Sequence, residues 1–494
     1  LCMNTWSRNC VTGSEKRPCR WHEAAEMPGN IFQVVTDRRI ISVGKPSQNN
    51  NRNNRINLKS VNTMLRTTLI SIAFAALIIS GCSQRTMTLE ERLASLPADT
   101  IFRIESDTTF SEAWEIRLRQ PVDHRNPDGE QFTQQVFLYY AGADRPVVVE
   151  TEGYGARGGR NELASVLNAN FIRIEHRYFE ESRPDSAGWE YLTTWQAATD
   201  HHRIIELFKP VFSGKWATTG ISKGGQTVMF HRYYYPDDVD VSVPYVAPLN
   251  FGPEDERMYP FLENVGTPEC RERVFSFQKL VLEKFDVLYP MFLDMAGKRE
   301  WTFNRVGGPE IAFEMTVLEY EFAFWQWGMI PCDSIPLEGT DDQIFRHFVA
   351  TGDPSYFADQ GLPRYEPFFY QAMTEIGYYG YDFDKFGSLL RYAHNTDKPE
   401  FLFSAPQGET YVYDYEFGHK VDEFIKKDAE NFIFLYGEYD PWSATAADPG
   451  DNEKCLKIVR EGGSHRTRIK NLPDGQRELV LDRLGEWMDS PVAR

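Results

Sequence analysis

A serine between two glycines is the feature that most constrains how this chain can fold. The strand-length run KWATT leads into Gly220-Ile221-Ser222-Lys223-Gly224, and the apolar-rich segment GQTVMFHRYYY follows. Side chains crowd a tight turn from strand to helix, and a glycine two residues to either side of the serine relieves that crowding. The spacing therefore predicts that Ser222 is exposed on a sharp turn, where a serine can act as a nucleophile.

Segments with strand-like and helix-like patterns alternate before this turn. The runs from Pro146 to Val149 and from Phe171 to Ile174 predict strands, and Thr193 or Thr194 can cap a helix that stops at Pro210. A repeated order of strand, helix and strand is typical of a mainly parallel sheet. Together with the serine turn, this pattern predicts an α/β-hydrolase core.

The pattern changes after residue 250 and returns near the C-terminus. Longer amphipathic segments and aromatic-rich loops extend to about residue 427, and then two strand-like runs, NFIFLY and CLKIV, precede a helix from Arg477 to Met488. We therefore expect a fold of the α/β class: a hydrolase core in two parts, 101–250 and 428–494, with a mostly helical cap domain, 251–427, inserted in it.

Two further residues complete a catalytic triad in the prediction. A serine hydroxyl is a poor nucleophile at neutral pH, so a histidine must take its proton and a carboxylate must orient that histidine. In α/β-hydrolases the order along the chain is serine, acid, histidine. Asp440 follows the run FIFLY and His465 follows CLKIV, each just past a predicted strand. Taken singly, Asp440 is equally well a turn residue before Pro441, and His465 an exposed loop histidine.

Backbone N–H groups should stabilise the oxyanion that forms when the serine attacks. The residue after the nucleophile, Lys223, supplies one of them in this fold, and a loop after an earlier strand supplies the other. Gly153 and Tyr154, in the segment EGYG, occupy that loop. Glycine there is also compatible with an ordinary turn.

The segment from Met64 to Cys82 reads as an export signal. Arg66 precedes an apolar run from Leu69 to Ile79, which ends in small residues and Cys82. We expect 64–81 to be a lipoprotein signal peptide, Cys82 to carry the lipid, and 82–100 to be a polar tether. Residues 1–63, upstream of a signal that must be N-terminal, are not expected in the mature protein. The predicted location is the bacterial cell envelope, with the protein exported and lipid-anchored to a membrane.

Composition excludes several classes of partner. The net charge is −19, which repels nucleic acid, and no run of lysines and arginines offsets it. Only Cys270, Cys332 and Cys455 follow Cys82, with no CxxC pair to bind a metal. One disulfide is possible, and we expect it between Cys270 and Cys332 because both lie in the inserted segment. No metal or cofactor is expected.

Several short segments carry a resemblance to a known family. They are QPVDH (120–124), EGYG (152–155), EHRYFEESRP (175–184), GISKGG (220–225), DVDVSVPYVAP (238–248) and GEYDPW (437–442). Together they resemble the PS-10 peptidases, family S37, which are secreted tripeptidyl and tetrapeptidyl aminopeptidases. The resemblance implies that Ser222, Asp440 and His465 are the triad and that the substrate is a peptide with a free N-terminus.

An exopeptidase of this kind must bind the ammonium group of its substrate, which requires a carboxylate. In PEIAFEMTVLEYEFAFWQWG, apolar residues share one helical face, and Glu310, Glu314 and Glu321 form a stripe along its edge. Glu321 is the most central candidate and Glu152 is a second, although a solvated face is the commoner origin of such a stripe. The aromatics of the insert are compatible with an apolar pocket for proline, or with an ordinary core.

The triad and the resemblance together imply a serine aminopeptidase that releases tripeptides or tetrapeptides from free N-termini through an acyl-enzyme on Ser222. Cleavage after proline is one form that this activity can take. The same fold and triad serve a carboxylic-ester hydrolase, because specificity depends on the cap. A catalytically inactive surface binding protein is the third reading of the same fold.

Overall fold

The computed structural model describes residues 87–494, apart from 107–108, 329 and 396–398. The predicted signal peptide 64–81, Cys82 and the upstream residues 1–63 lie outside the described residues. The chain divides into two compact units. Of the described residues, 87–251, Asp414–Gly437 and Thr445–Arg494 form what we call the sheet unit, and Gly252–Tyr413 with Glu438–Ala444 form the helical unit.

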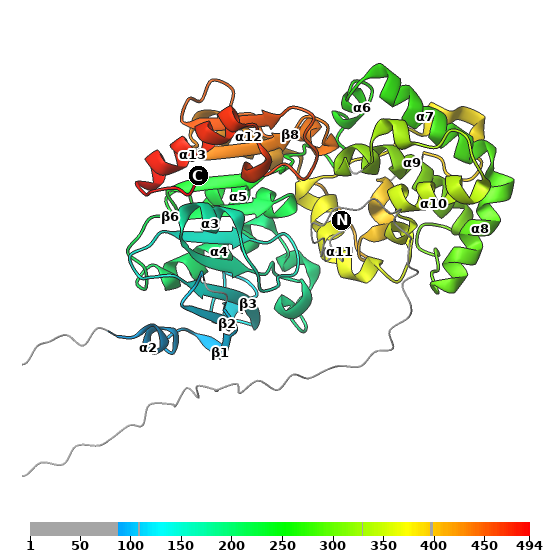
Figure 1. The fold of residues 1–494 in the computed structure, drawn as a ribbon. Coiled ribbons are helices and arrows are strands. Elements are labelled where there is room, and N and C mark those ends of the chain that lie inside the picture. The colour runs from blue at the N-terminus through cyan, green and yellow to red at the C-terminus, as the bar shows by residue number, and fades with distance from the viewer. Residues whose placement is uncertain (1–86, 107–108, 329, 396–398) are drawn as a thin grey trace, which may run out of the picture. The chain divides into compact units, whose positions relative to one another are not determined.

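One sheet of nine strands is the framework of the sheet unit, in the order β1-β2-β3-β5-β4-β6-β7-β8-β9. Figure 1 shows it from the blue edge strand β1 to the orange strand β8. The strands are β1 (Ala98–Ile104), β2 (Glu112–Pro121), β3 (Gln131–Tyr140), β4 (Val147–Thr151), β5 (Asn170–Ile174), β6 (Trp216–Ile221), β7 (Val241–Tyr245), β8 (Phe432–Gly437) and β9 (Cys455–Arg460). The pairs β1–β2, β2–β3 and β3–β5 are antiparallel, and from β5 to β9 every pair is parallel.

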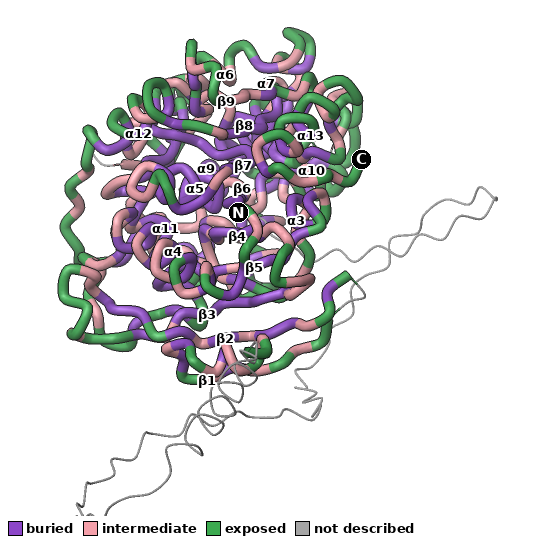
Figure 2. Tube along the Cα trace, turned by 90° about the vertical axis from the view of Figure 1, so that its left-hand side faces the viewer, coloured by how far each residue is buried: buried purple, intermediate pink, exposed green. Residues whose placement is uncertain are grey.

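Helices cover both faces of this sheet, which explains why its central strands are buried almost throughout. The helices of the sheet unit are α2 (Leu89–Leu93), α3 (Glu162–Leu167), α4 (Thr194–Phe208), α5 (Lys223–Tyr234), α12 (Tyr415–Lys427) and α13 (Asp474–Met488). In β4, Val148 packs in a cluster with α3 and α13, while Val147 and Val149 pack in another with α4. Figure 2 shows β4, β6 and β7 as buried.

The helical unit is built around one helix, α9 (Pro309–Trp327), which is buried on all sides from Ala312 to Gln326. Its other helices are α6 (Met258–Leu262), α7 (Pro268–Glu283), α8 (Phe285–Lys298), α10 (Asp341–Gly352) and α11 (Leu362–Gln371), with short helical turns between them. The amphipathic interpretation of the α9 sequence, with one apolar face and a glutamate stripe, is therefore wrong. Glu314 and Glu321 are both buried.

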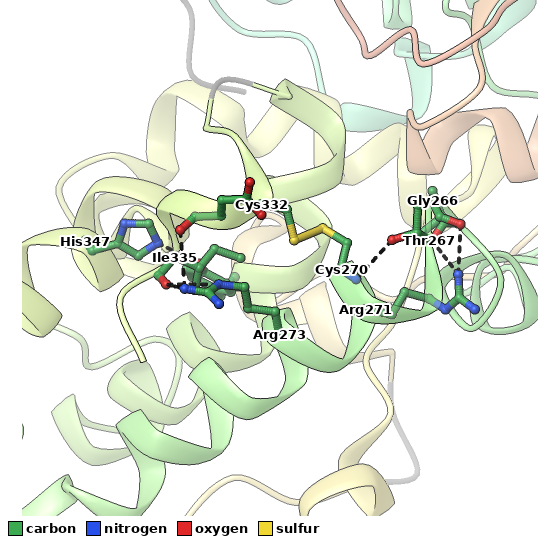
Figure 3. The surroundings of a disulfide bond; sticks show 11 residues. Gly266, Thr267, Cys270, Arg271, Arg273, Cys332, Ile335 and His347 are labelled. Carbon is green, nitrogen blue, oxygen red and sulfur yellow. Dashed lines mark hydrogen bonds between the residues drawn. A yellow bond between two sulfur atoms is a disulfide. The ribbon is translucent and has the colours of Figure 1, made fainter. Parts of the chain in front are cut away.

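A disulfide joins Cys270 in α7 to Cys332 in the short helical turn η3 (Cys332–Ser334), as expected (Figure 3). Beside it, the Arg273 guanidinium donates to the carbonyl oxygen of Ile335 over 2.6 Å. The bond closes the stretch of chain that contains α8 and α9. Cys455 is the free cysteine among the described residues.

Two predicted boundaries are wrong. The segment 82–100 was expected to be a polar tether, but Thr88 caps α2, whose Leu93 is buried, and β1 already pairs with β2 from Ala98. The cap was expected to extend to residue 427, but α12 belongs to the sheet unit, where its Phe417 packs against Phe230 of α5.

Candidate active site

Ser222 lies on a strained turn between β6 and α5. Its φ of 57° and ψ of −123° lie in a region that residues other than glycine rarely adopt. A side chain at Gly220 would put its Cβ 2.2 Å from the carbonyl oxygen of Gly224, and one at Gly224 would come within 2.8 Å of the Thr151 carbonyl oxygen. Both glycines are therefore required by close backbone approach, as the sequence predicted.

The turn at Ser222 is hydrogen-bonded to the last residue of β7, Tyr245. The Ser222 N–H donates to the carbonyl oxygen of Tyr245 over 2.8 Å, and the Ser222 carbonyl accepts from the Gln226 N–H over 3.0 Å, which starts α5. The Arg468 guanidinium lies 5.6 Å from the centre of the Tyr245 ring. Arg468 also donates to the carbonyl oxygen of His465 over 3.1 Å. Tyr245 therefore contacts both the serine turn and the loop that carries the predicted histidine.

His465 lies in a turn just after β9, and it is 5% exposed. Gly437, the last residue of β8, packs against this turn so closely that an added Cβ would lie 2.5 Å from the Gly463 and Ser464 backbones. Because β6 to β9 are parallel, their carboxyl ends share one edge of the sheet. Ser222 and the His465 turn both follow strands at this edge.

Asp440 follows the end of β8 by three residues and is completely buried. The Trp442 N–H donates to its Oδ1 over 3.3 Å. The residues around Asp440 pack within the helical unit: the ring of Trp442 lies edge-on to Phe322 of α9 at 5.3 Å, and Tyr439 is edge-on to Trp325 at 5.6 Å. Aromatic contacts on both sides of Asp440 thus fix the backbone from which its carboxylate projects.

The EGYG loop after β4 packs on the first turn of α5. An added Cβ at Gly153 would lie 2.6 Å from the Lys223 Cβ and 2.7 Å from the Gly224 nitrogen. The Tyr154 carbonyl accepts from the His176 N–H over 3.1 Å. The predicted oxyanion residues therefore come from two segments of the sheet unit that pack together: Gly153 and Tyr154 from the loop after β4, and Lys223 from the residue after Ser222.

Glu152, in the same loop, shares the Arg173 guanidinium with Glu150. The Arg173 Nε lies 3.2 Å from the Glu152 Oε1, and the Arg173 Nη2 lies 2.6 Å from the Glu150 Oε2. Burial, reinforced by the negative charge of Glu150, raises the pKa of Glu152 from its ordinary value of 4.5 to about 8. Burial thus disfavours the charged form of this side chain, an effect that the shared Arg173 guanidinium offsets only in part.

Glu321 lines a cavity of about 360 Å³ in the helical unit. Its carboxylate forms an ion pair with the Lys385 ammonium, and both side chains are mostly buried. The cavity is amphipathic: Phe275, Phe322, Phe386 and Leu318 line it together with charged residues and Gln278. The side-chain oxygen of Gln278 is buried without a hydrogen-bond partner in the structure. The cavity thus offers a carboxylate and a spare acceptor beside aromatic walls.

The sequence patterns do not identify Glu319, a buried carboxyl of the helical unit. Its Oε2 accepts hydrogen bonds from the hydroxyls of Tyr379 and Tyr381, each over 2.7 Å. Burial raises its pKa from 4.5 to about 7. No local signal identifies such a residue, since its partners are sixty residues away in the chain.

The EHRYF segment also has a structural role that its sequence does not reveal. The Arg177 guanidinium is fully buried and donates twice to the Asp200 carboxylate, over 2.7 and 2.8 Å. His124 Nε2 lies 2.7 Å from the same carboxylate. This network joins the segments that follow β2 and β5 to α4.

Neither a metal site nor a membrane span is found in the part of the chain that the structure describes. No three His, Cys, Asp or Glu side chains in that part are grouped to hold a metal ion. In the same part, every helix is too short or too polar to cross a bilayer.

Comparison with known proteins identifies the family. The family model of the PS-10 peptidase S37 matches residues 82–493. The prolyl tri/tetrapeptidyl aminopeptidase of Streptomyces mobaraensis is 30% identical over 442 residues, which cover 86% of this chain and 92% of that protein. The lysosomal Pro-X carboxypeptidase of Bos taurus is 25% identical over 37% of this chain and 40% of its own.

Among solved structures, the proline iminopeptidase of Mycobacterium smegmatis aligns with 75% of this chain and 98% of its own, at 14% identity and a TM-score of 0.35. The sheet of mainly parallel strands with a serine on a strained turn after β6 is the arrangement that the family match leads one to expect. The chain belongs to the PS-10 peptidase S37 family and is a serine-type peptidase on an α/β-hydrolase fold.

Proposed function

We propose that this peptidase removes tripeptides or tetrapeptides, cutting after proline, from the free N-termini of oligopeptides. The observation that carries the proposal is the strained Ser222 turn packed against the EGYG loop, in a chain 30% identical to a prolyl tri/tetrapeptidyl aminopeptidase. Peptide substrates of this kind need no metal for cleavage by a serine nucleophile.

In the proposed mechanism the Ser222 hydroxyl attacks the scissile carbonyl carbon while His465 takes the hydroxyl proton. Asp440 orients the imidazole and stabilises the imidazolium. The oxyanion accepts hydrogen bonds from the Lys223 N–H and from an N–H of Gly153 or Tyr154. His465 then protonates the leaving amine, and water releases the acyl group from Ser222 by the reverse sequence of proton transfers.

The test is incubation of the full chain and of its Ser222→Ala variant with proline-containing peptide amides, with products identified by mass. Tripeptides or tetrapeptides should appear from free N-termini only, and loss of Ser222 should lower turnover on the order of a million-fold. Ser186→Ala, which removes an exposed serine hydroxyl bonded to Glu130, is the matched control and should leave turnover unchanged. Cleavage of N-acetylated peptides at the same rate would refute the aminopeptidase assignment.

We further propose that Glu321, rather than Glu152, binds the substrate's ammonium group. Glu152 shares one guanidinium with Glu150 and has a pKa of about 8, so it is a weak partner for a cation at neutral pH. Glu321 lies in a cavity with aromatic walls and an unpaired acceptor, Gln278. An ammonium group can replace Lys385 as the counter-ion of Glu321 and donate to the Gln278 oxygen.

Two substitutions separate binding from a structural role. Glu321→Gln removes the carboxylate and should raise KM for peptides with free N-termini at least tenfold. Lys385→Met breaks the same ion pair but keeps the carboxylate, so KM should stay the same or fall. If both variants raise KM equally, the ion pair is structural and Glu321 does not bind substrate. Glu272→Gln, in the same cavity, is the control for a general loss of negative charge.

We also propose that the protein is exported and attached to a cell-envelope membrane through a lipid on Cys82. The support is the order of Met64, Arg66, an apolar run and Cys82 in the sequence. Expression of the full chain in a bacterium fed labelled palmitate should give a labelled product, and Cys82→Ser should abolish the label. If mass spectrometry of the purified protein shows that it still contains residues 1–63, the proposal is wrong.

A further inference from the structure

We propose that Lys223 is a positioning residue, whose buried side chain holds the EGYG loop in the orientation that the oxyanion hole requires. The proposal rests on the acyl-transfer mechanism proposed above. In that mechanism the backbone N–H of Lys223 is an oxyanion donor, but its side chain has no assigned role.

The side chain of Lys223 bonds to the loop directly. Its Nζ donates to the carbonyl oxygen of Gly153 over 2.7 Å, and the residue is only 2% exposed. Lysine is among the residues least often buried, because its ammonium group loses its hydration. In the described residues no carboxylate forms an ion pair with Lys223, so the bond to Gly153 is the main polar compensation.

Two aromatic rings pack beside the amine of Lys223. Nζ lies 5.5 Å from the centre of the Tyr154 ring and 5.1 Å from that of the Phe179 ring, so both rings pack beside the amine in either protonation state. Tyr154 belongs to the loop itself, and the two rings contact each other edge-on at 5.5 Å. The amine therefore has one carbonyl partner and two aromatic neighbours, which restrict its movement.

Fixing the Gly153 carbonyl fixes the next N–H as well. The carbonyl of Gly153 and the N–H of Tyr154 belong to one planar trans peptide and point in opposite directions. A carbonyl drawn towards Lys223 Nζ therefore sets the direction of the Tyr154 N–H. The following peptide is held too, because the Tyr154 carbonyl accepts from the His176 N–H. Without the amine, the Gly153 carbonyl loses the hydrogen bond from Lys223 that sets its direction.

The protonation state of the amine does not alter this role. Burial lowers the pKa of Lys223 well below its ordinary range, which favours the neutral amine. A neutral amine still has N–H groups to donate to a carbonyl. The restraint on Gly153 therefore persists across the pH range in which the enzyme is folded, and no pH-dependent switch is implied.

Lys223→Met tests the proposal, because methionine keeps the apolar stem and removes the donor. Loss of an oxyanion donor costs roughly a hundred- to thousand-fold in kcat. Misorientation of one should cost less, and we expect kcat to fall about ten- to a hundred-fold with KM nearly unchanged. The affinity of a peptide boronate, which mimics the tetrahedral intermediate, should fall by a similar factor, while that of the tripeptide product should not.

The chain offers a matched control. Lys215 Nζ also donates to a backbone carbonyl, that of Trp487, over 2.8 Å, but on the exposed surface of the sheet unit. Lys215→Met should leave kcat within twofold of the unmodified enzyme. Rates are divided by the number of active sites titrated to completion with a fluorophosphonate, so misfolded protein does not count. If Lys223→Met does not fold, Lys223→Gln keeps an N–H donor on a shorter side chain and should lose part of kcat.

Two results would overturn the proposal. One is a kcat within twofold of normal in folded Lys223→Met, and the other is a rise in KM with kcat unchanged, which would indicate substrate binding. A p-nitrophenyl ester is measured in parallel, because its hydrolysis needs the same oxyanion hole. If no peptide is cut but ester hydrolysis depends on Ser222, the proposed substrate is wrong, and the ester rates still decide the role of Lys223.

Discussion

At the scale of single residues, the serine turn stores strain that two glycines make tolerable. Ser222 adopts a φ of 57°, which costs on the order of 1–3 kcal/mol and must be offset by the packing around it. That packing leaves no room at Gly220, where an added methyl group would lie 2.2 Å from a backbone oxygen. Backbone atoms cannot rotate away, as the end of a side chain could.

We predict that Gly220→Ala lowers the free energy of unfolding by roughly 2–4 kcal/mol, the range of severe steric substitutions, and abolishes most turnover. Gly475→Ala, in α13 of the same unit, is the control. Nothing lies within 4 Å of its added methyl group, and alanine favours a helix, so stability should hold or rise by up to about 1 kcal/mol. Urea denaturation of both variants measures the difference. If both substitutions change the free energy of unfolding equally, the close backbone approach at Gly220 does not determine stability.

At the scale of secondary structure elements, local patterns predicted the sheet unit well and the helical unit poorly. The strand before Ser222, the N-cap at Thr193 and the strands before Asp440 and His465 depend on neighbours in sequence, and the structure has them as β6, α4, β8 and β9. The helix α9 depends on what surrounds it. Its glutamates are buried because partners distant in sequence reach them: Glu314 accepts three N–H groups from residues 391–393, and Glu319 accepts from two tyrosines.

Local sequence patterns also failed to predict α2 and β1, at the N-terminal edge of the sheet unit. Thr88 and Glu91 form a capping box for α2, but the preceding and following residues are polar enough to resemble a tether. Only pairing with β2 makes a strand of β1. Tertiary contacts, which single-sequence patterns do not contain, decide both cases.

The disulfide between α7 and η3 should stabilise the helical unit mainly by reducing the conformational entropy of the unfolded chain. It closes a loop with a sequence separation of 62, for which the chain-entropy estimate is about 4 kcal/mol. We predict that the paired substitution Cys270→Ser and Cys332→Ser lowers the melting temperature of the helical unit by several degrees or more. Calorimetry with Cys455→Ser as control measures this, since Cys455 forms no disulfide. Equal melting curves for the paired variant and the unmodified protein would exclude a stabilising role.

At the scale of the whole molecule, the helical unit is an insertion that begins at Gly252 and ends at Tyr413, with Glu438–Ala444 added from a later part of the chain. This addition contains Asp440, the acid of the proposed mechanism. Trp442 and Tyr439 anchor the acid to α9 through aromatic contacts. In the proposed mechanism, a change in the packing of the helical unit around Asp440 should therefore alter kcat as well as substrate binding.

Buried carboxyls also make the stability of the whole molecule depend on pH. Burial raises the pKa of Glu319 to about 7, and burial together with the nearby Glu254 raises that of Glu400 to about 8. A carboxyl with a higher pKa in the folded state binds more protons there than in the unfolded chain, where its pKa is near 4.5. Its stabilising contribution is therefore complete below pH 4.5 and is lost as pH rises through 7 to 8. The rise in net negative charge acts in the same direction.

We predict that the melting temperature falls as pH rises from 5 to 8.5, and that Glu319→Gln reduces this fall. Glutamine resembles the protonated acid and can still accept from Tyr379 and Tyr381, so the variant should match the unmodified protein near pH 5 and exceed it near pH 8.5. By linkage, the shift from 4.5 to about 7 corresponds to at most roughly 3 kcal/mol. Glu416→Gln, on an exposed residue, should leave the pH profile unchanged. If the melting temperatures of Glu319→Gln and the unmodified protein change with pH in parallel, Glu319 titrates outside this range. The pH dependence of stability would then come from the other buried carboxyls or from net charge.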